Sequence, residues 1–269
     1  MGLFSRLKVL FSALRKTAYP WPALDVTLTN HQQLHLVGSI HMGTRGMSPL
    51  PERLLQKLQQ ADALIVEADV SGNESPFNDL PPRPPLAERL NAAQSAALNT
   101  ILTELALPLE AFDTQPAWKI ALVLQATQAQ RLGLRPDYGI DYQLLDAAHK
   151  EGIPVIELEG TQNQVELLAR LPEDGMALLQ DTLTHWHTNA RLLQIMIGWW
   201  LDNPPRDRAS ALPSTFSEPL YDILMHQRNE AWCARLYALP PGNYVVAAGA
   251  LHLYGEGNLP ALLRQKNGQ

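Results

Sequence analysis

Two short apolar runs enclose a helical pattern near the start of the chain, and this arrangement restricts the fold most. Residues 34–40 and residues 63–67 each read as a buried strand, while residues 52–61 place leucines along one helical face. A strand, a helix and a strand within about 33 residues are typical of a βαβ unit, in which the strands run parallel. The sequence therefore predicts a sheet with parallel strands and a right-handed crossover.

The same alternation continues along the chain. Residues 154–158 and 243–249 are further apolar strand patterns, and a Pro-Pro-Gly turn precedes the second. Helices are predicted over residues 86–107, 116–132, 138–150, 163–201 with a break near 172–175, 220–238 and 259–264, and a proline-rich loop over 71–85. We expect an α/β fold with a central mixed, partly parallel sheet flanked by helices, and a helical insertion in the middle of the chain. One domain is expected over residues 20–269.

Charge and cysteine content exclude several classes of protein. The formal net charge is −6, whereas a nucleic-acid binder concentrates positive charge to displace the counterions of phosphates. We therefore expect no nucleic-acid partner. With Cys233 as the single cysteine, neither an intramolecular disulfide nor a cysteine-rich zinc module is expected.

The first 18 residues are predicted to form an amphipathic helix. Apolar residues recur at helical spacing within residues 3–16, with arginine and lysine among them. Such a helix either packs on its own domain or makes weak contact with an anionic membrane surface. It lacks the apolar core and cleavage site of a signal peptide, and no apolar run approaches the ~20 residues of a transmembrane segment. We expect a cytoplasmic protein without a transmembrane segment.

Three side chains that can do chemistry follow predicted strands. His41 comes after the first strand, Glu67 ends the second, and His252 comes after the last. Functional groups of open α/β sheets gather beyond the carboxyl ends of the strands, so these three are expected at one edge. Asp69 would share a face with Glu67 if the second strand continued that far.

Each histidine stands in a Gly-x-x-His motif, which begins at Gly38 or at Gly249. Glycine lets the backbone turn sharply and lets another chain or a ligand come close. Two imidazoles and a carboxylate are common ligands of a catalytic divalent metal with water in an open position. The same groups also suit a histidine base oriented by a carboxylate, or hydrogen-bonded structural histidines. Spacing alone leaves these readings open.

Four segments together resemble the TraB/GumN family, which is related to the Tiki proteases and more distantly to erythromycin esterase and ChaN-like proteins. They are Val37-Gly38-Ser39-Ile40-His41-Met42-Gly43, Val66-Glu67-Ala68-Asp69, Tyr138-Gly139-Ile140-Asp141 and Ala248-Gly249-Ala250-Leu251-His252-Leu253. The resemblance covers residues 20–265. It implies an α/β fold with a central sheet, two Gly-x-x-His motifs and a functional glutamate.

The resemblance also implies roles for particular residues. His41, Glu67 and His252 would be the catalytic or metal-binding set, holding a divalent ion such as Mn, Co or Zn. Supporting or substrate-binding positions would be Gly38, Asp69, Asp141, Glu159, Arg228, Asn229 and Gly249. Arg228 would bind a substrate carboxylate or pair with one of these acids. Glu159 precedes Gly-Thr-Gln-Asn-Gln, which departs from the family's usual Thr-x-x-Glu-Gln.

These observations lead to three functional hypotheses. The first is a metal-dependent hydrolase, such as a peptidase, in which Glu67 is a ligand or the general base and the substrate is a peptide or a small molecule. The second is a non-catalytic peptide-binding or regulatory protein of the TraB type. The third is an esterase-like hydrolase that uses His41 as a base without a metal.

Overall fold

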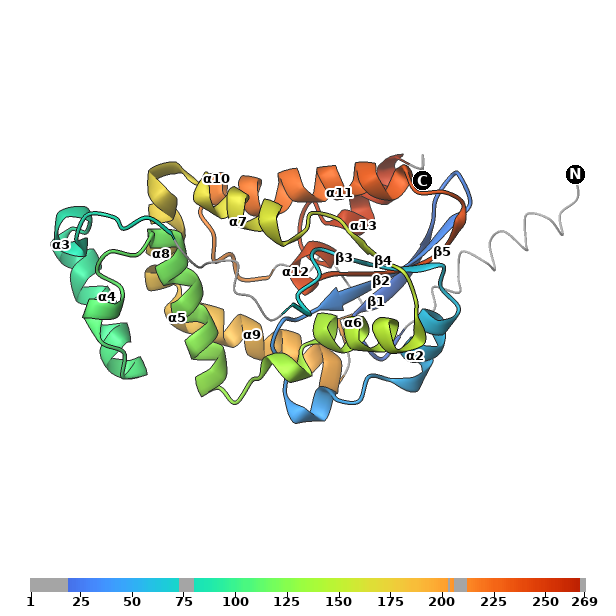
Figure 1. Ribbon diagram of the computed structural model, residues 1–269, viewed down its shortest axis with the longest axis horizontal. Helices are drawn as coiled ribbons and strands as arrows, with labels where there is room; N and C mark the ends of the chain where they lie inside the picture. Colours follow the sequence, from blue (N-terminus) through green and yellow to red (C-terminus); the bar gives the residue numbers. More distant parts are fainter. Residues whose placement is uncertain (1–18, 73–79, 203, 206–211, 267–269) are drawn as a thin grey trace, which may run out of the picture.

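A five-stranded mixed sheet forms the centre of the protein (Figure 1). The computed structural model describes residues 19–72, 80–202, 204–205 and 212–266. The strands are β1 (Ala23–Thr27), β2 (Gln32–Ser39), β3 (Ala63–Val66), β4 (Val155–Glu157) and β5 (Gly242–Gly249), in the order β1-β2-β5-β3-β4. β1 pairs with β2 in antiparallel fashion, and the remaining pairs are parallel. The predicted mixed, partly parallel sheet is confirmed.

The helices follow the predicted order, with more interruptions than the sequence indicated. They are α2 (Glu52–Gln59), α3 (Leu86–Arg89), α4 (Ala92–Leu105), α5 (Ala117–Arg131), α6 (Ile140–Glu151), α7 (Thr161–Ala169), α8 (Met176–Thr184), α9 (Trp186–Leu201), α10 (Glu218–Tyr221), α11 (Gln227–Tyr237), α12 (Ala250–Leu253) and α13 (Leu259–Lys266). A π-helical turn, Asp222–His226, joins α10 to α11.

Another strand lies between the two strands of the βαβ unit. β2, α2 and β3 follow one another as predicted, and β2 and β3 are parallel to the same partner. That partner is β5, the last strand of the chain, which lies between them and pairs with both. β5 is an almost uninterrupted apolar run because a central strand is buried on both faces of the sheet.

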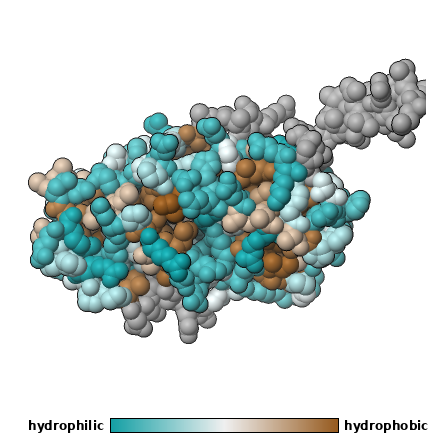
Figure 2. Space-filling model, turned by 90° about the horizontal axis from the view of Figure 1, so that it is seen from above, coloured by the Kyte–Doolittle hydropathy of each residue, from teal (hydrophilic) through white to brown (hydrophobic). Residues whose placement is uncertain are grey.

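Helices cover both faces of the sheet and also extend beyond it. One face carries Val37, Val66 and Ala247 against α2 and α6, and the other carries Leu36, Ile65 and Val246 against α11 and α13. A third apolar cluster lies among α4, α5 and α8, away from the sheet. On the side of α7, α10 and α11, Figure 2 shows separate hydrophobic patches among hydrophilic side chains.

The predicted N-terminal helix, residues 1–18, lies outside the described residues, as do residues 73–79 of the predicted proline-rich loop. Within the described part of the chain, no helix is long and apolar enough to cross a membrane.

Candidate functional site

The carboxyl ends of three parallel strands meet at one edge of the sheet. Ser39 at the end of β2 is in register with Gly249 of β5, and Val66 at the end of β3 is in register with Ala247. The segments that carry His41, Glu67 and His252 leave the sheet at this edge.

His41 is an exposed side chain held by a buried carboxylate. Its Nδ1 lies 2.5 Å from Oδ2 of Asp141, and the side chain is 69% exposed whereas that of Asp141 is 10% exposed. The negative charge of Asp141 and its hydrogen bond stabilise the imidazolium, and they raise the pKa of His41 to about 9. His41 is therefore protonated at neutral pH, with Nδ1–H donating to Asp141.

Two backbone segments bring Asp141 to His41. The N–H of Ile140 donates to the carbonyl of Ile40 at 2.9 Å, which joins the start of α6 to the segment after β2. A Cβ added at Gly139 would lie 2.3 Å from the carbonyl oxygen of His41, which is closer than a carbon atom can approach. The glycine of the Tyr138-Gly139-Ile140-Asp141 segment thus allows the contact that positions Asp141.

Glu67 is a buried carboxylate with three hydrogen-bond donors. Oε1 accepts the backbone N–H of Gly249 at 2.7 Å, and Oε2 accepts Nη2 of Arg228 at 2.6 Å and the amide of Gln164 at 3.4 Å. Burial favours the protonated acid, but the positive charge of Arg228, the neighbouring histidines and the Gly249 hydrogen bond outweigh burial. They lower the pKa of Glu67 to about 2.

Arg228 connects two glutamates and a histidine. Its Nε and Nη2 donate to the two oxygens of Glu159 at 2.7 and 2.9 Å, a bidentate pair, while Nη2 also reaches Glu67. The guanidinium lies 4.7 Å from the ring of Trp232, which itself donates its indole N–H to Glu159. Of the two predicted roles of Arg228, the structure shows the pairing with acids of this chain.

His252 is buried and lies against Arg228. Its Nδ1 is 2.7 Å from Oδ1 of Asn229, its Nε2 is 3.3 Å from Nη1 of Arg228, and its ring centroid is 4.3 Å from that of Trp232. Burial lowers the pKa of His252 to about 4, against the opposing effect of Glu67, so the ring is neutral at pH 7. In that state Nδ1–H donates to Asn229, and Nε2 accepts from Arg228.

Asp69 and Gly38 lie apart from these contacts. β3 ends at Val66, so Asp69 does not share a strand face with Glu67, and its carboxylate lies 3.5 Å from His149. The carbonyl of Gly38 accepts the indole N–H of Trp200 at 3.0 Å. A Cβ at Gly38 would lie 3.2 Å from Cα of Ala250, so this glycine permits close packing of α12 on β2.

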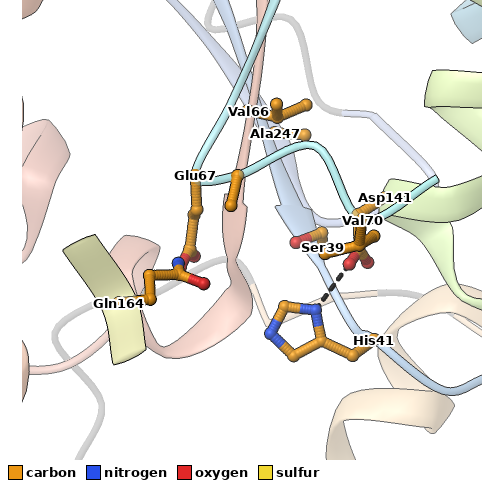
Figure 3. Close-up of a pocket in the computed structure, with 9 residues that line it drawn as sticks. Ser39, His41, Val66, Glu67, Val70, Asp141, Gln164 and Ala247 are labelled. Atoms are coloured by element: carbon orange, nitrogen blue, oxygen red, sulfur yellow. Dashed lines mark hydrogen bonds and ion pairs between the residues drawn. The ribbon is translucent and has the colours of Figure 1, made fainter. Parts of the chain in front are cut away.

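A hollow of about 10 Å³, comparable to the room that one water molecule needs, lies between His41 and Glu67. Its polar lining also includes Ser39, Asp141 and Gln164 (Figure 3). Glu67 and Gln164 lie on one side and His41 and Asp141 on the other, and the second ring nitrogen of His41 is directed away from Asp141. Oδ1 of Asp141 is buried and has no hydrogen-bond partner among the described residues.

The predicted metal ligands do not fit a divalent ion in this arrangement. Oε2 of Glu67 and Nε2 of His252 both accept from Arg228, so the guanidinium lies where an ion shared by these two side chains would have to bind. Among the described residues, no group of three or more His, Cys, Asp or Glu side chains has a geometry that could hold an ion. Binding of an ion to this set would require Arg228 to withdraw.

Two residues of the site, Gln164 and Trp232, are not among those predicted from the sequence. Gln164 donates to Glu159 at 3.1 Å as well as to Glu67. Gln164 lies in the segment after Glu159 that departs from the family pattern. That departure is the feature of the sequence that could have indicated its role. Trp232 lies one helical turn after Arg228, and in sequence it is indistinguishable from an ordinary core residue of α11.

The fold and the site define an α/β protein with a network of buried charges at the carboxyl edge of its sheet. The model of the TraB/PrgY/gumN family matches residues 24–268. The chain is 60% identical to the YbaP proteins of Escherichia coli K12 and of Shigella flexneri, over 98% of this chain and 100% of each relative. The chain therefore belongs to the TraB/PrgY/gumN family. No solved structure is a significant match.

Proposed function

We propose that this protein is a hydrolase of ester or amide bonds in which Glu67 and His41 exchange protons with the reactants. The observation that carries the proposal is the opposite pKa shift of two groups that line one hollow. Glu67 stays ionised because its pKa is about 2, and His41 stays protonated because its pKa is about 9. Titratable groups whose environments push their pKa values apart are typical of acid–base pairs.

In this reaction Glu67 orients the attacking water and accepts one of its protons as the water oxygen bonds to the substrate carbonyl. His41 donates the proton on Nε2 to the leaving alcohol or amine as the bond to that group breaks. The proton on Glu67 then returns to His41 through water in the hollow. Asp141 holds the imidazole in place. The positive charge of Arg228 favours the ionised form of Glu67 and so favours this return of the proton.

A digest of peptide and chromogenic-ester libraries by the full-length protein tests this reaction. We expect cleavage that persists in the presence of a chelator. His41→Ala and Glu67→Gln should each lower the rate by about 100- to 10,000-fold, the usual contribution of an acid or base. His149→Ala is the matched control, because His149 is also a partly exposed histidine beside an aspartate and does not line the hollow.

Two other outcomes would contradict the proposal. Cleavage that a chelator abolishes and that Mn²⁺, Co²⁺ or Zn²⁺ restores would favour the metal-dependent hydrolase, with His41, Glu67 and His252 as its predicted ligands. Measurement of the metal content of the wild type and of the His41→Ala, His252→Ala double variant would then test those ligands. Tight binding of a peptide without cleavage under any condition would instead favour a non-catalytic regulatory protein.

A further inference from the structure

A second and much larger cavity lies beside α12. Its volume is about 620 Å³, within the range of about 300–1,000 Å³ that is typical of sites for small ligands. Leu251 and Tyr254, which lie on either side of His252 in sequence, form part of its wall. The cavity is distinct from the hollow between His41 and Glu67, because the two share none of their described lining residues.

Most of the wall is apolar or aromatic. Leu192 of α9 is buried on one side, Phe216 lies two residues before α10, and Tyr221 is the last residue of α10. Met225 lies in the π-helical turn, and Tyr254 follows α12 with its ring 4.3 Å from that of Trp199. Three separate segments of the chain, in α9, in residues 212–226 and in residues 251–256, therefore line a surface suited to an aliphatic or aromatic body.

Among the described residues of the wall, the acidic and basic side chains carry one sign of charge. Glu218 and Glu256 are both exposed, and no lysine or arginine is found among the described residues that line the cavity. Aromatic rings and carboxylates together favour a cation, through the negative faces of the rings and through charge-assisted hydrogen bonds. We propose that this cavity is a binding site for an organic cation with an aromatic or aliphatic body, such as an arylalkyl amine.

The position of the cavity links it to the charged site. Tyr221, Met225 and His226 of its wall belong to the helix that continues without a break into Arg228, and the turn between them is π-helical. π-helical turns often occur at functional sites. The Leu224 carbonyl in this turn accepts Nη1 of Arg228 at 3.2 Å. A ligand in the cavity thus contacts the element that holds Arg228, whether or not the protein is a hydrolase.

Three probes of one shape test the charge preference: 3-phenylpropylamine, 3-phenylpropanol and 3-phenylpropanoate. Their affinities for the full-length protein are to be measured by calorimetry and by saturation-transfer NMR at the same pH. We expect the ammonium form to bind at least about tenfold more tightly than the alcohol, a difference that one charge-assisted hydrogen bond can produce. The carboxylate should bind most weakly. Equal affinity of the amine and the alcohol would overturn the proposal.

Two variants locate the binding. The Glu218→Gln, Glu256→Gln double variant should remove the preference for the amine and leave the alcohol's affinity unchanged, since both side chains are exposed and their loss should not disturb folding. Leu251→Trp should lower the affinity of all three probes by filling space. Glu230→Gln, an exposed residue of α11 that does not line the cavity, is the control. An amine preference that survives in the double variant would refute the assignment. Because these assays measure binding, they are independent of the outcome of the hydrolysis test.

Discussion

The two Gly-x-x-His segments end in histidines whose surroundings are opposite. His41 follows β2, is 69% exposed, and is paired with the carboxylate of Asp141. His252 follows β5, is 5% exposed, and lies between an amide of Asn229 and the guanidinium of Arg228. The pKa of the first is raised to about 9 and that of the second is lowered to about 4.

This difference shows that the Gly-x-x-His motif places each histidine at the edge of the sheet. The residues that surround the histidine determine its charge. A carboxylate stabilises the imidazolium at the exposed position, whereas burial beside a guanidinium stabilises the neutral ring. His41 can therefore transfer a proton at neutral pH, and His252 serves as a hydrogen-bond acceptor that orients Arg228.

Removal of Arg228 should destabilise the His252 side of the site most. Arg228→Ala leaves the buried Glu67 and the partly buried Glu159 without their cation, and such a loss costs about 3–5 kcal/mol in the free energy of unfolding. Urea unfolding measures the change. Arg170→Ala, which breaks an exposed pair with Glu166 on α7, should cost below about 1 kcal/mol. Similar losses for the two variants would show that the Arg228 network does not stabilise the fold.

As the pH falls, protonation of His252 should lower the free energy of unfolding before protonation of Glu67 does. Because the folded pKa of His252 is about 4 and its ordinary value is 6.5, its contribution is complete above pH 6.5 and is lost as the pH falls through 4. The loss amounts to at most about 3 kcal/mol. His252→Gln should reduce the pH dependence of the free energy of unfolding between pH 6.5 and 4. The exposed control His149→Gln should leave that pH dependence unchanged. An unchanged slope in His252→Gln would contradict the lowered pKa.

Gly139→Ala should disturb the His41 side by separating His41 from Asp141. The added Cβ would lie 2.3 Å from the His41 carbonyl oxygen, and such overpacking costs about 1–3 kcal/mol. Gly198→Ala in α9 is the matched control, because nothing lies within 4 Å of its added Cβ. Thermal unfolding should show a loss in the first variant and a gain of up to about 1 kcal/mol in the second. Equal stabilities would mean that the close approach at Gly139 is not required.

The smallest effect on stability is expected from Asp141→Asn, because His41 is 69% exposed and solvent screens its pair with Asp141. The main effect should be on the titration of His41. Without the carboxylate, the pKa of His41 should fall from about 9 toward its ordinary value of 6.5, while that of His252 should stay near 4. NMR titration of the imidazole signals resolves both values. In the wild type, the stability that His41 contributes is complete below pH 6.5 and is lost as the pH rises through 9. A pKa of His41 near 6.5 in the wild type would contradict the pairing with Asp141.

Much of the fold could be predicted because hydrophobic periodicity is local. The runs at residues 34–40, 63–67, 154–158 and 243–249 correspond to β2, β3, β4 and β5. β1, Ala23–Thr27, was missed because the polar residues Asp25 and Thr27 interrupt its apolar residues, so that it is not a continuous apolar run. The insertion of β5 between β2 and β3 was also missed, because its paired residues are 210 positions from those of β2 and 181 from those of β3, and such pairing leaves no local pattern.

The sequence by itself determined the α/β class, the strand ends and the residue types that stand there, because periodicity and glycine placement act through neighbours in the chain. Only the tertiary structure decided which partner each residue meets. It placed Asp141, a hundred residues away, on His41, and it placed Arg228 between Glu67, Glu159 and His252. Charge and burial depend on those long-range contacts, and they make one Gly-x-x-His histidine a cation and the other a neutral acceptor.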